Sequence, residues 1–312
     1  MSASSAGSGE LSLIEWIRAG TRAQASVPTG IGDDAAVVRG GSNDELLVTT
    51  DMLMDGVDFV VGTTPTELIG RKCLAVNLSD IAAMGGRPVA AVISLALPKQ
   101  RGRELAEGLY AGIWPLAEEF DVGLAGGDTN TWEGPLVVSI TVVGRPGADG
   151  PVLRSGARPG DWLFVTGPLG GSLSGRHLSF SPRIREAAEL QSRVKLHAMI
   201  DLSDGLATDV RHLARESGVG VVVDARDVPI HADVEPSQAD DERLQHALCD
   251  GEDFELLFAV APDDGRRLLS NRDRLTPVHR IGEVTDGADC LLRTEDGSLR
   301  PLPPGGWEHA LG

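Results

Sequence analysis

The sequence predicts an α/β or α+β protein of two domains, and three observations support this prediction. The chain has 312 residues, of which 41% are hydrophobic, so it is long enough for two cores. Segments with strand-like and helix-like patterns alternate in both halves. Between them, residues 144–160 are dominated by Gly, Pro, Ala and Arg. We therefore predict a disordered tail over residues 1–10, an N-terminal domain over residues 11–148 and a C-terminal domain over residues 149–312.

The first half is predicted to contain three helices and four strands. Residues 11–19 carry apolar side chains at helical spacing. Residues 65–84 form one long helix, because Pro65 suits a first helical turn and Gly85 and Gly86 mark the end. The third helix is amphipathic and covers residues 104–120. The predicted strands cover residues 46–50, 89–97, 122–125 and 136–143.

The second half repeats this alternation with shorter elements. A strand over residues 162–166 leads into a glycine-rich segment, residues 167–175. Further strands are predicted over residues 198–200, 219–223 and 254–260, and helices over residues 205–216, 242–249 and 266–274. Two more strands are expected before Trp307.

Composition excludes several classes of partner. The net charge of −18 repels nucleic acid and anionic lipid. The three cysteines are widely spaced and form no zinc or disulfide pattern, which is typical of a reducing compartment. The N-terminus lacks the basic and apolar parts of a signal peptide, and the most apolar segment, residues 89–97, is too short to span a bilayer. We expect a cytoplasmic protein.

Seven aspartates lie where a charge is unfavourable without a partner. Asp80 lies in the long helix, which is apolar on nearly every side, and a buried unpaired carboxylate is strongly destabilising. Each aspartate alone is more often a helix cap or a turn residue. Together they favour one shared site for Mg²⁺, Mn²⁺ or Ca²⁺, which prefer oxygen ligands. The other six follow predicted strands or lie in glycine-flanked loops: Asp33, Asp34, Asp51, Asp128, Asp201 and Asp204.

Other catalytic patterns are weaker. The glycine-rich segment 167–172 lacks the lysine of a phosphate-binding P-loop, so a turn into a helix explains it better. The sequence contains no Gly-x-Ser-x-Gly elbow and no Cys-His arrangement that would support a nucleophilic hydrolase.

Taken together, the acidic motifs resemble the thiamine-monophosphate kinase family of the aminoimidazole ribonucleotide synthetase superfamily. The resemblance extends from about residue 13 to residue 311. It is specific because seven motifs occur in order: GIGDDAA (30–36), TDML (50–53), NLSDIAAMG (77–85), GGDT (126–129), RSGARPGD (154–161), IDLSDGL (200–206) and GEDFEL (251–256).

This resemblance implies a fold, an activity and a set of site residues. The N-terminal domain is expected to form a barrel with that of a second copy, giving a homodimer with active sites near the subunit contact. The activity implied is in-line transfer of the ATP γ-phosphate to thiamine monophosphate, with several Mg²⁺ ions. The implied metal ligands are Asp34, Thr49, Thr50, Asp51, Asp80, Asp128, Asp201 and Asp204. ATP is expected to contact Tyr110, Gly127, Asp128, Arg154 and Ser203, and the acceptor to contact Asp58, Glu252 and Trp307. The candidate catalytic residues are Asp51, Asp80, Asp128 and Asp204.

Two departures from the family pattern affect these expectations. Position 58 is Asp where the family often has His, which puts an acid beside the expected substrate phosphate. The segment from residue 175 to residue 182 is short, so a helix or lid of the family is expected to be reduced.

The expected chemistry requires no general base. The attacking group is the substrate's own phosphate, whose second pKa of about 6 leaves it mostly ionised at neutral pH. Two alternatives remain open at this point: another ATP-using enzyme of the same superfamily, or a regulatory protein that binds nucleotide and metal without catalysis.

Overall fold

The structure is a computed structural model, and the description covers residues 10–41, 44–270 and 277–306 of the chain. Its N-terminal half contains a five-stranded sheet in the order β1-β2-β5-β3-β4, in which β3 and β4 are parallel and the other neighbours are antiparallel. The strands are β1 (Ala36–Gly41), β2 (Asp44–Met54), β3 (Gly86–Pro98), β4 (Gly123–Trp132) and β5 (Val137–Pro146). The helices of this half are α1 (Glu10–Gly20), α2 (Thr66–Ala83) and α3 (Gly102–Glu119).

The two faces of this sheet differ in composition and exposure. Residues alternate along each strand, so one face carries the buried side chains of Ile93 and Ile140 and packs against α2. The opposite face carries Met52 and Val92, which are 63% and 41% exposed. We call this second surface the open face.

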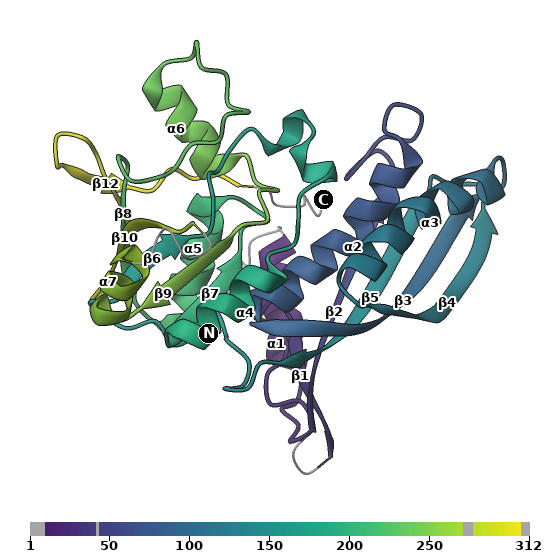
Figure 1. Cartoon of the computed structure of the whole chain (residues 1–312), viewed down its shortest axis with the longest axis horizontal. Coiled ribbons are helices and arrows are strands. Elements are labelled where there is room, and N and C mark those ends of the chain that lie inside the picture. Colours follow the sequence, from purple (N-terminus) through teal and green to yellow (C-terminus); the bar gives the residue numbers. More distant parts are fainter. Residues whose placement is uncertain (1–9, 42–43, 271–276, 307–312) are drawn as a thin grey trace, which may run out of the picture.

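Helix α2 lies at the centre of the molecule, between the first sheet and the C-terminal half (Figure 1). It is apolar on nearly every side because the sheet, α3, α4 and β7 all pack against it. Its glycine Gly70, and Gly112 on α3, allow the two helix backbones to approach closely. The hydrophobic core of the first sheet continues across α2 to side chains of the other half, including Ile184 and Leu190.

The C-terminal half contains a seven-stranded sheet in the order β12-β11-β8-β10-β6-β9-β7. Its strands are β6 (Trp162–Val165), β7 (Leu196–Asp201), β8 (Gly220–Asp224), β9 (Leu256–Val260), β10 (His279–Thr285), β11 (Cys290–Arg293) and β12 (Leu299–Pro301). The helices are α4 (Ile184–Arg193), α5 (Leu206–Ser217), α6 (Asp240–Cys249) and α7 (Pro262–Ser270), with short 3-10 turns η1 (Ser172–Ser174) and η2 (Arg176–Leu178).

These elements confirm the predicted mixed α/β class and refine its details. Helix α4 was not predicted, and three strands instead of two follow residue 276. The segment 175–182 contains η2 and no α-helix. Strand β3 begins three residues earlier than predicted, since a register shift between Pro88 and Ala90 accommodates the proline. Among the described residues, none of the helices combines the length and the apolarity needed to cross a membrane.

Candidate active site

Four aspartates meet where α2 faces the C-terminal half. Asp51 lies on β2, Asp80 on α2 and Asp201 at the end of β7, while Asp34 lies in the loop before β1. Asp34, Asp80 and Asp201 each offer one carboxylate oxygen, and the three oxygens lie within 4.8 Å of one another. Asp51 is within hydrogen-bonding reach of Asp80. We call these four residues the acidic cluster.

Hydroxyl groups fix the orientation of two of these carboxylates. The Thr49 hydroxyl donates to Oδ2 of Asp80. Ser79 precedes Asp80 on α2, and its hydroxyl donates to Oδ2 of Asp201 at 2.6 Å. Helix α2 thus presents one acid of the cluster and orients another that comes from the C-terminal half.

Arg154 brings a positive charge to the edge of the cluster. Its guanidinium donates to Oδ1 of Asp34 at 2.7 Å, and its backbone N–H donates to Oδ1 of Asp33 at 2.9 Å. Burial raises the pKa of Asp33 to about 7, although the hydrogen bond from Arg154 opposes this shift. One guanidinium therefore faces several acids, which leaves the cluster with an excess of negative charge.

The electrostatics of the cluster show this excess. Burial raises the pKa of Asp51 to about 6. Burial, and then the neighbouring charge of Asp51, raises the pKa of Asp80 well above its ordinary value. Burial and the charge of Asp34 do the same for Asp201. Four carboxylates in so small a volume require protons or cations to be stable.

A second group of possible ligands lies beside the first, at the start of α5. Asp204, Asp209 and His212 each offer a ligand atom, and these atoms lie within 4.8 Å of one another. The buried carboxylate of Asp209 accepts a hydrogen bond from the backbone N–H of Asp204 at 3.1 Å. Sequence reasoning identified Asp204 but missed Asp209 and His212. In the sequence, Asp209 and His212 are three residues apart and share the face of the predicted helix that also carries apolar residues. That spacing was the signal that could have identified them.

The two acids expected to contact the acceptor substrate are joined by a lysine. Asp58 accepts a hydrogen bond from the backbone N–H of Met54 at 2.7 Å, so its carboxylate closes its own turn. The ammonium of Lys72 donates to the carbonyl of Asp58 and to the carboxylate of Glu252. Sequence reasoning missed Lys72, and its only signal was a lysine within an apolar helix.

Three predicted site residues lie away from the cluster within one chain. Thr50 is on the open face, where its hydroxyl bonds Thr141 and the carbonyl of Ile140. Asp128 follows Gly127 on β4, pairs in register with Ser94 of β3, and is exposed. Two strands, β5 and β3, separate β4 from β2 in the sheet.

The remaining predicted residues have distinct settings. Tyr110 is half-buried on α3, with its ring 5.6 Å from that of Trp114. The carbonyl of Ser203 accepts a hydrogen bond from the backbone N–H of Glu252 at 2.7 Å. Trp307 lies outside the described residues.

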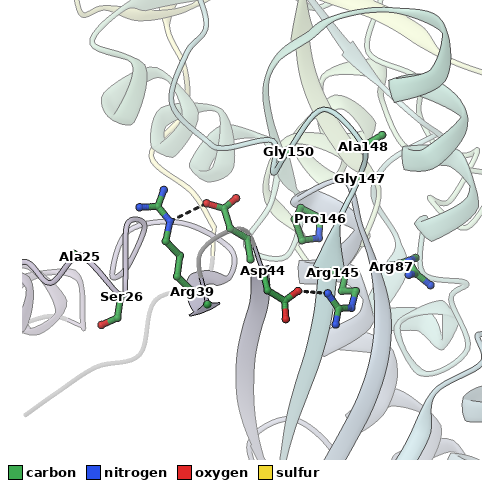
Figure 2. Close-up of a pocket in the computed structure, with 12 residues that line it drawn as sticks. Ala25, Ser26, Arg39, Asp44, Arg87, Arg145, Pro146, Gly147, Ala148 and Gly150 are labelled. Carbon is green, nitrogen blue, oxygen red and sulfur yellow. Dashed lines mark hydrogen bonds and ion pairs between the residues drawn. The ribbon is translucent and has the colours of Figure 1, made fainter.

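A hollow of about 870 Å³ lies elsewhere, between the β1–β2 hairpin and the turn at residues 147–150 (Figure 2). Two arginines of its lining have partners: Arg39 pairs with Glu45, and Arg145 pairs with Asp44. None of the acidic cluster lines it. The acidic cluster, which combines buried carboxylates with Arg154, is therefore the candidate active site.

Comparison with known proteins gives the family of the chain. Residues 32–145 match the AIR synthase related protein N-terminal domain, and residues 158–293 match the corresponding C-terminal domain. The thiamine-monophosphate kinase of Rhodopirellula baltica is 41% identical over 311 residues, which cover 96% of this chain and 97% of that protein. The chain belongs to the thiamine-monophosphate kinase family of AIR synthase related proteins.

Further comparisons support the same family assignment. The Bacillus subtilis protein is 34% identical over 325 residues, covering 96% of this chain and 99% of its own. The structure of AaThiL complexed with AMPPCP and TMP has a TM-score of 0.83 at 30% identity, and the match covers 96% of this chain and 97% of that one. A HypE–HypF complex matches with a TM-score of 0.75 but only 19% identity, which shows the fold alone.

Proposed function

We propose that the chain transfers the γ-phosphate of ATP to thiamine monophosphate and forms thiamine diphosphate. The observation that carries this proposal is the near full-length similarity to thiamine-monophosphate kinases, up to 41% identity. It is supported by the close structural match to AaThiL holding AMPPCP, a nucleotide of the ATP type, together with TMP. A cytoplasmic location is part of the proposal, and three free cysteines suit a reducing compartment.

The acidic cluster fits a divalent cation. Among the described residues, four buried side-chain oxygens have no hydrogen-bond partner, and two of them belong to the acidic cluster: Oδ2 of Asp34 and Oδ2 of Asp51. The other two are Oδ1 of Asn77, which lies on α2 with Asp80, and Oε1 of Gln238. Buried acceptors without donors are unfavourable, and oxygen-only donor sets are what Mg²⁺ prefers. Bound there, Mg²⁺ would supply the positive charge that lets ATP approach the acids and an anionic acceptor. We propose the following ligands within one chain: Asp34, Thr49, Asp51, Asp80, Asp201 and Asp204.

The chain's own groups orient the reactants. The side chain of Arg154 is 22% exposed, so it is available to an ATP phosphate while it stays paired with Asp34. The substrate phosphate is the nucleophile and is already ionised at neutral pH, so no side chain must remove a proton. The protein contributes by positioning two anions in line.

We propose that the protein is a homodimer, because the first sheet has two free edges. Strand β1 pairs with β2 only as far as Val48, so residues 49–54 of β2 have β5 as their single neighbour among the described strands. Strand β4 forms the other edge, and all its residues but Leu124 are exposed. Two such edges, together with Met52 and Val92 exposed on the open face, favour closure of a barrel by a second copy.

Closure of this barrel also explains the position of Asp128. In the proposed two-fold pair, β4 of one copy would lie against the free part of β2 in the other. That arrangement would bring Gly127 and Asp128 of one copy to Thr50 and Asp51 of the other. We therefore propose that the full ligand set, with Thr50 and Asp128, is assembled from both copies.

The proposed activity is tested by a coupled assay of ADP release with thiamine monophosphate, ATP and Mg²⁺. We expect release that depends on all three components and formation of thiamine diphosphate in equal amount. Release no greater than that of a blank without thiamine monophosphate would support the alternative, a nucleotide- and metal-binding regulatory protein.

A further inference from the structure

Lys72 is the most completely buried charged residue of α2, and no step of the proposed reaction uses it. Its side chain is 1% exposed. Its ammonium donates to Oε1 of Glu252 at 2.6 Å and to the carbonyl oxygen of Asp58 at 3.0 Å. It thus connects α2 of the N-terminal half to the loop before β9 of the C-terminal half.

Packing alone does not account for this lysine. Removal of an ammonium from water is unfavourable, and an apolar side chain of similar volume often serves a buried position equally well or better. The contacts of Lys72 are instead directional, since each is a hydrogen bond to a defined oxygen. Its carboxylate partner, Glu252, keeps 27% of its side chain exposed. Lys72 therefore holds one carboxylate oxygen of Glu252, Oε1, while part of the Glu252 side chain remains accessible to solvent.

The loop that carries Glu252 is held in an unusual conformation. Glu252 and Phe254 have φ angles of 52° and 51°, in the left-handed region that non-glycine residues rarely adopt. Their backbone N–H groups donate to the carbonyls of Ser203 and Leu202, at 2.7 and 2.8 Å. Backbone hydrogen bonds therefore hold this loop against residues 202–203, which precede Asp204. The hydrogen bond from Lys72 holds it against α2.

We propose that Lys72 is a positioning residue for the acceptor substrate. It holds the Glu252 carboxylate and the turn ending at Asp58 as one wall of the acceptor site. It also offsets the negative charge that these two acids would present to an incoming phosphate. The outer side of Glu252 is left to contact the cationic part of the acceptor, the thiazolium ring of thiamine monophosphate. This inference rests on the proposed function and adds to it the residue that sets acceptor affinity.

The test compares Lys72→Met, Lys72→Arg and Glu252→Gln with the unaltered chain in the ADP-release assay. Loss of one charged hydrogen bond predicts that Lys72→Met raises the KM for thiamine monophosphate about 10- to 100-fold. The KM for ATP and the dissociation constant for Mn²⁺, measured by electron paramagnetic resonance without nucleotide, should change less than about twofold. Lys72→Arg should restore part of the acceptor affinity, because it keeps the charge.

A matched control and a double variant separate positioning from simple stability. Lys99→Met removes a lysine that is exposed and pairs with Glu133, so it should leave every kinetic constant unchanged. The double variant Lys72→Met, Glu252→Gln should raise the KM for thiamine monophosphate by less than the two single effects combined, since both substitutions remove the same contact. The proposal is overturned if Lys72→Met keeps a normal KM for thiamine monophosphate. It is equally overturned if Lys72→Met, Lys72→Arg and Glu252→Gln all lower Mn²⁺ affinity, ATP affinity and melting temperature in parallel.

Failure of the proposed function would look different. In that case the unaltered chain would show no turnover with thiamine monophosphate, whatever stands at position 72. Binding of thiamine monophosphate to the unaltered chain and to Lys72→Met, followed by calorimetry, would then decide the inference without catalysis. Equal affinities would overturn it.

Discussion

At the residue scale, the central feature is the set of carboxylates that repel one another. Asp80 is half-buried and has Asp51, Asp201 and Asp34 as charged neighbours. The Thr49 hydroxyl donates a hydrogen bond to its Oδ2. Without a bound cation, repulsion among these carboxylates therefore destabilises the folded protein. Binding of a cation removes that repulsion. Removal of one of these charges should therefore lower the activity and raise the stability of the metal-free protein.

Replacement of Asp80 by Asn tests this opposition. The variant should lose turnover by at least about 100-fold, because a ligand of the proposed cation is gone. In EDTA it should be more stable than the unaltered chain by about 1–3 kcal/mol, because one buried like charge has been removed. Urea unfolding with and without Mg²⁺ measures both effects. Near-normal activity of Asp80→Asn would contradict the metal assignment.

The pH dependence of the metal-free protein should follow the same carboxylates. The pKa of Asp51 is about 6 in the folded state, above its ordinary value, so the folded chain binds more protons than the unfolded chain in this range. Its stabilising contribution is complete below the unfolded pKa and is lost as pH rises through about 6. The pKa of Asp33, about 7, extends the window upward.

In EDTA, the free energy of unfolding should therefore fall between pH 5 and pH 8, by about 1–1.5 kcal/mol for Asp51 and by more for Asp33, whose pKa is higher. Urea titrations at intervals of pH measure this slope. The Asp33→Asn, Asp51→Asn double variant serves as the control and should flatten the slope. A slope that rises with pH, or one that is unchanged in the double variant, would contradict these pKa shifts.

The sequence could predict the residues of the cluster but not all of their neighbours. Asp51, Asp80 and Asp201 were detectable because each interrupts an apolar segment or ends a strand, and a buried charge requires a partner. Asp209 was not, since an acid in the first turn of a helix is ordinary at a solvent-exposed surface. Whether it is buried depends on tertiary packing, which a local pattern does not encode.

At the scale of elements, α2 and α3 pack through backbone contact. A Cβ added at Gly112 would lie 1.7 Å from the carbonyl oxygen of Glu67, and one at Gly70 would lie 2.0 Å from that of Leu109. The crossing therefore depends on glycine at both positions. It fixes where α2 lies and, through α2, where Asp80 and Lys72 lie.

Gly112→Ala should destabilise the protein by about 3 kcal/mol or more, because neither backbone can yield enough to admit a methyl group. Gly20→Ala is the control, since a Cβ there has no atom within 4 Å, and it should change stability by less than about 0.5 kcal/mol. Chemical denaturation of both variants in EDTA measures the difference. Equal stabilities would show that the helices can separate without loss.

Helices were predicted correctly from the sequence where the apolar pattern was strong. They were missed where polar residues outnumbered the apolar ones. Helix α2 was found almost to its ends, because a long apolar run closed by glycines has few alternatives. Helix α4 was missed because its ten residues are mostly polar, and only three of them are buried. Its place in the fold is set by the side chains that reach α2, which its composition barely shows.

At the scale of the whole molecule, the proposed dimer predicts that a complete active site requires two copies of the chain. Each active site should take Asp80 from one copy and Asp128 from the other. The variants Asp80→Asn and Asp128→Asn should each be inactive. When they are mixed, unfolded and refolded together, half of the dimers are mixed pairs with one intact site, so activity should return to about a quarter of normal.

Refolding of each variant by itself is the control for this experiment and should give no activity. A mixture that stays inactive while chromatography shows mixed dimers would place Asp80 and Asp128 in the same site of one chain. The assay also needs no assumption about the number of metal ions.

One further consequence follows from the core that passes across α2. The side chains of α4 pack on the same helix as the first sheet, so neither half has a complete hydrophobic interior by itself. A fragment ending near residue 150 would expose the flank of α2 that α4 normally shields, and we expect it to aggregate when expressed alone. Calorimetry of the intact chain should show a single melting event. The linker between the two sheets is thus a poor place to cut the protein, and partners for fusion belong at its termini.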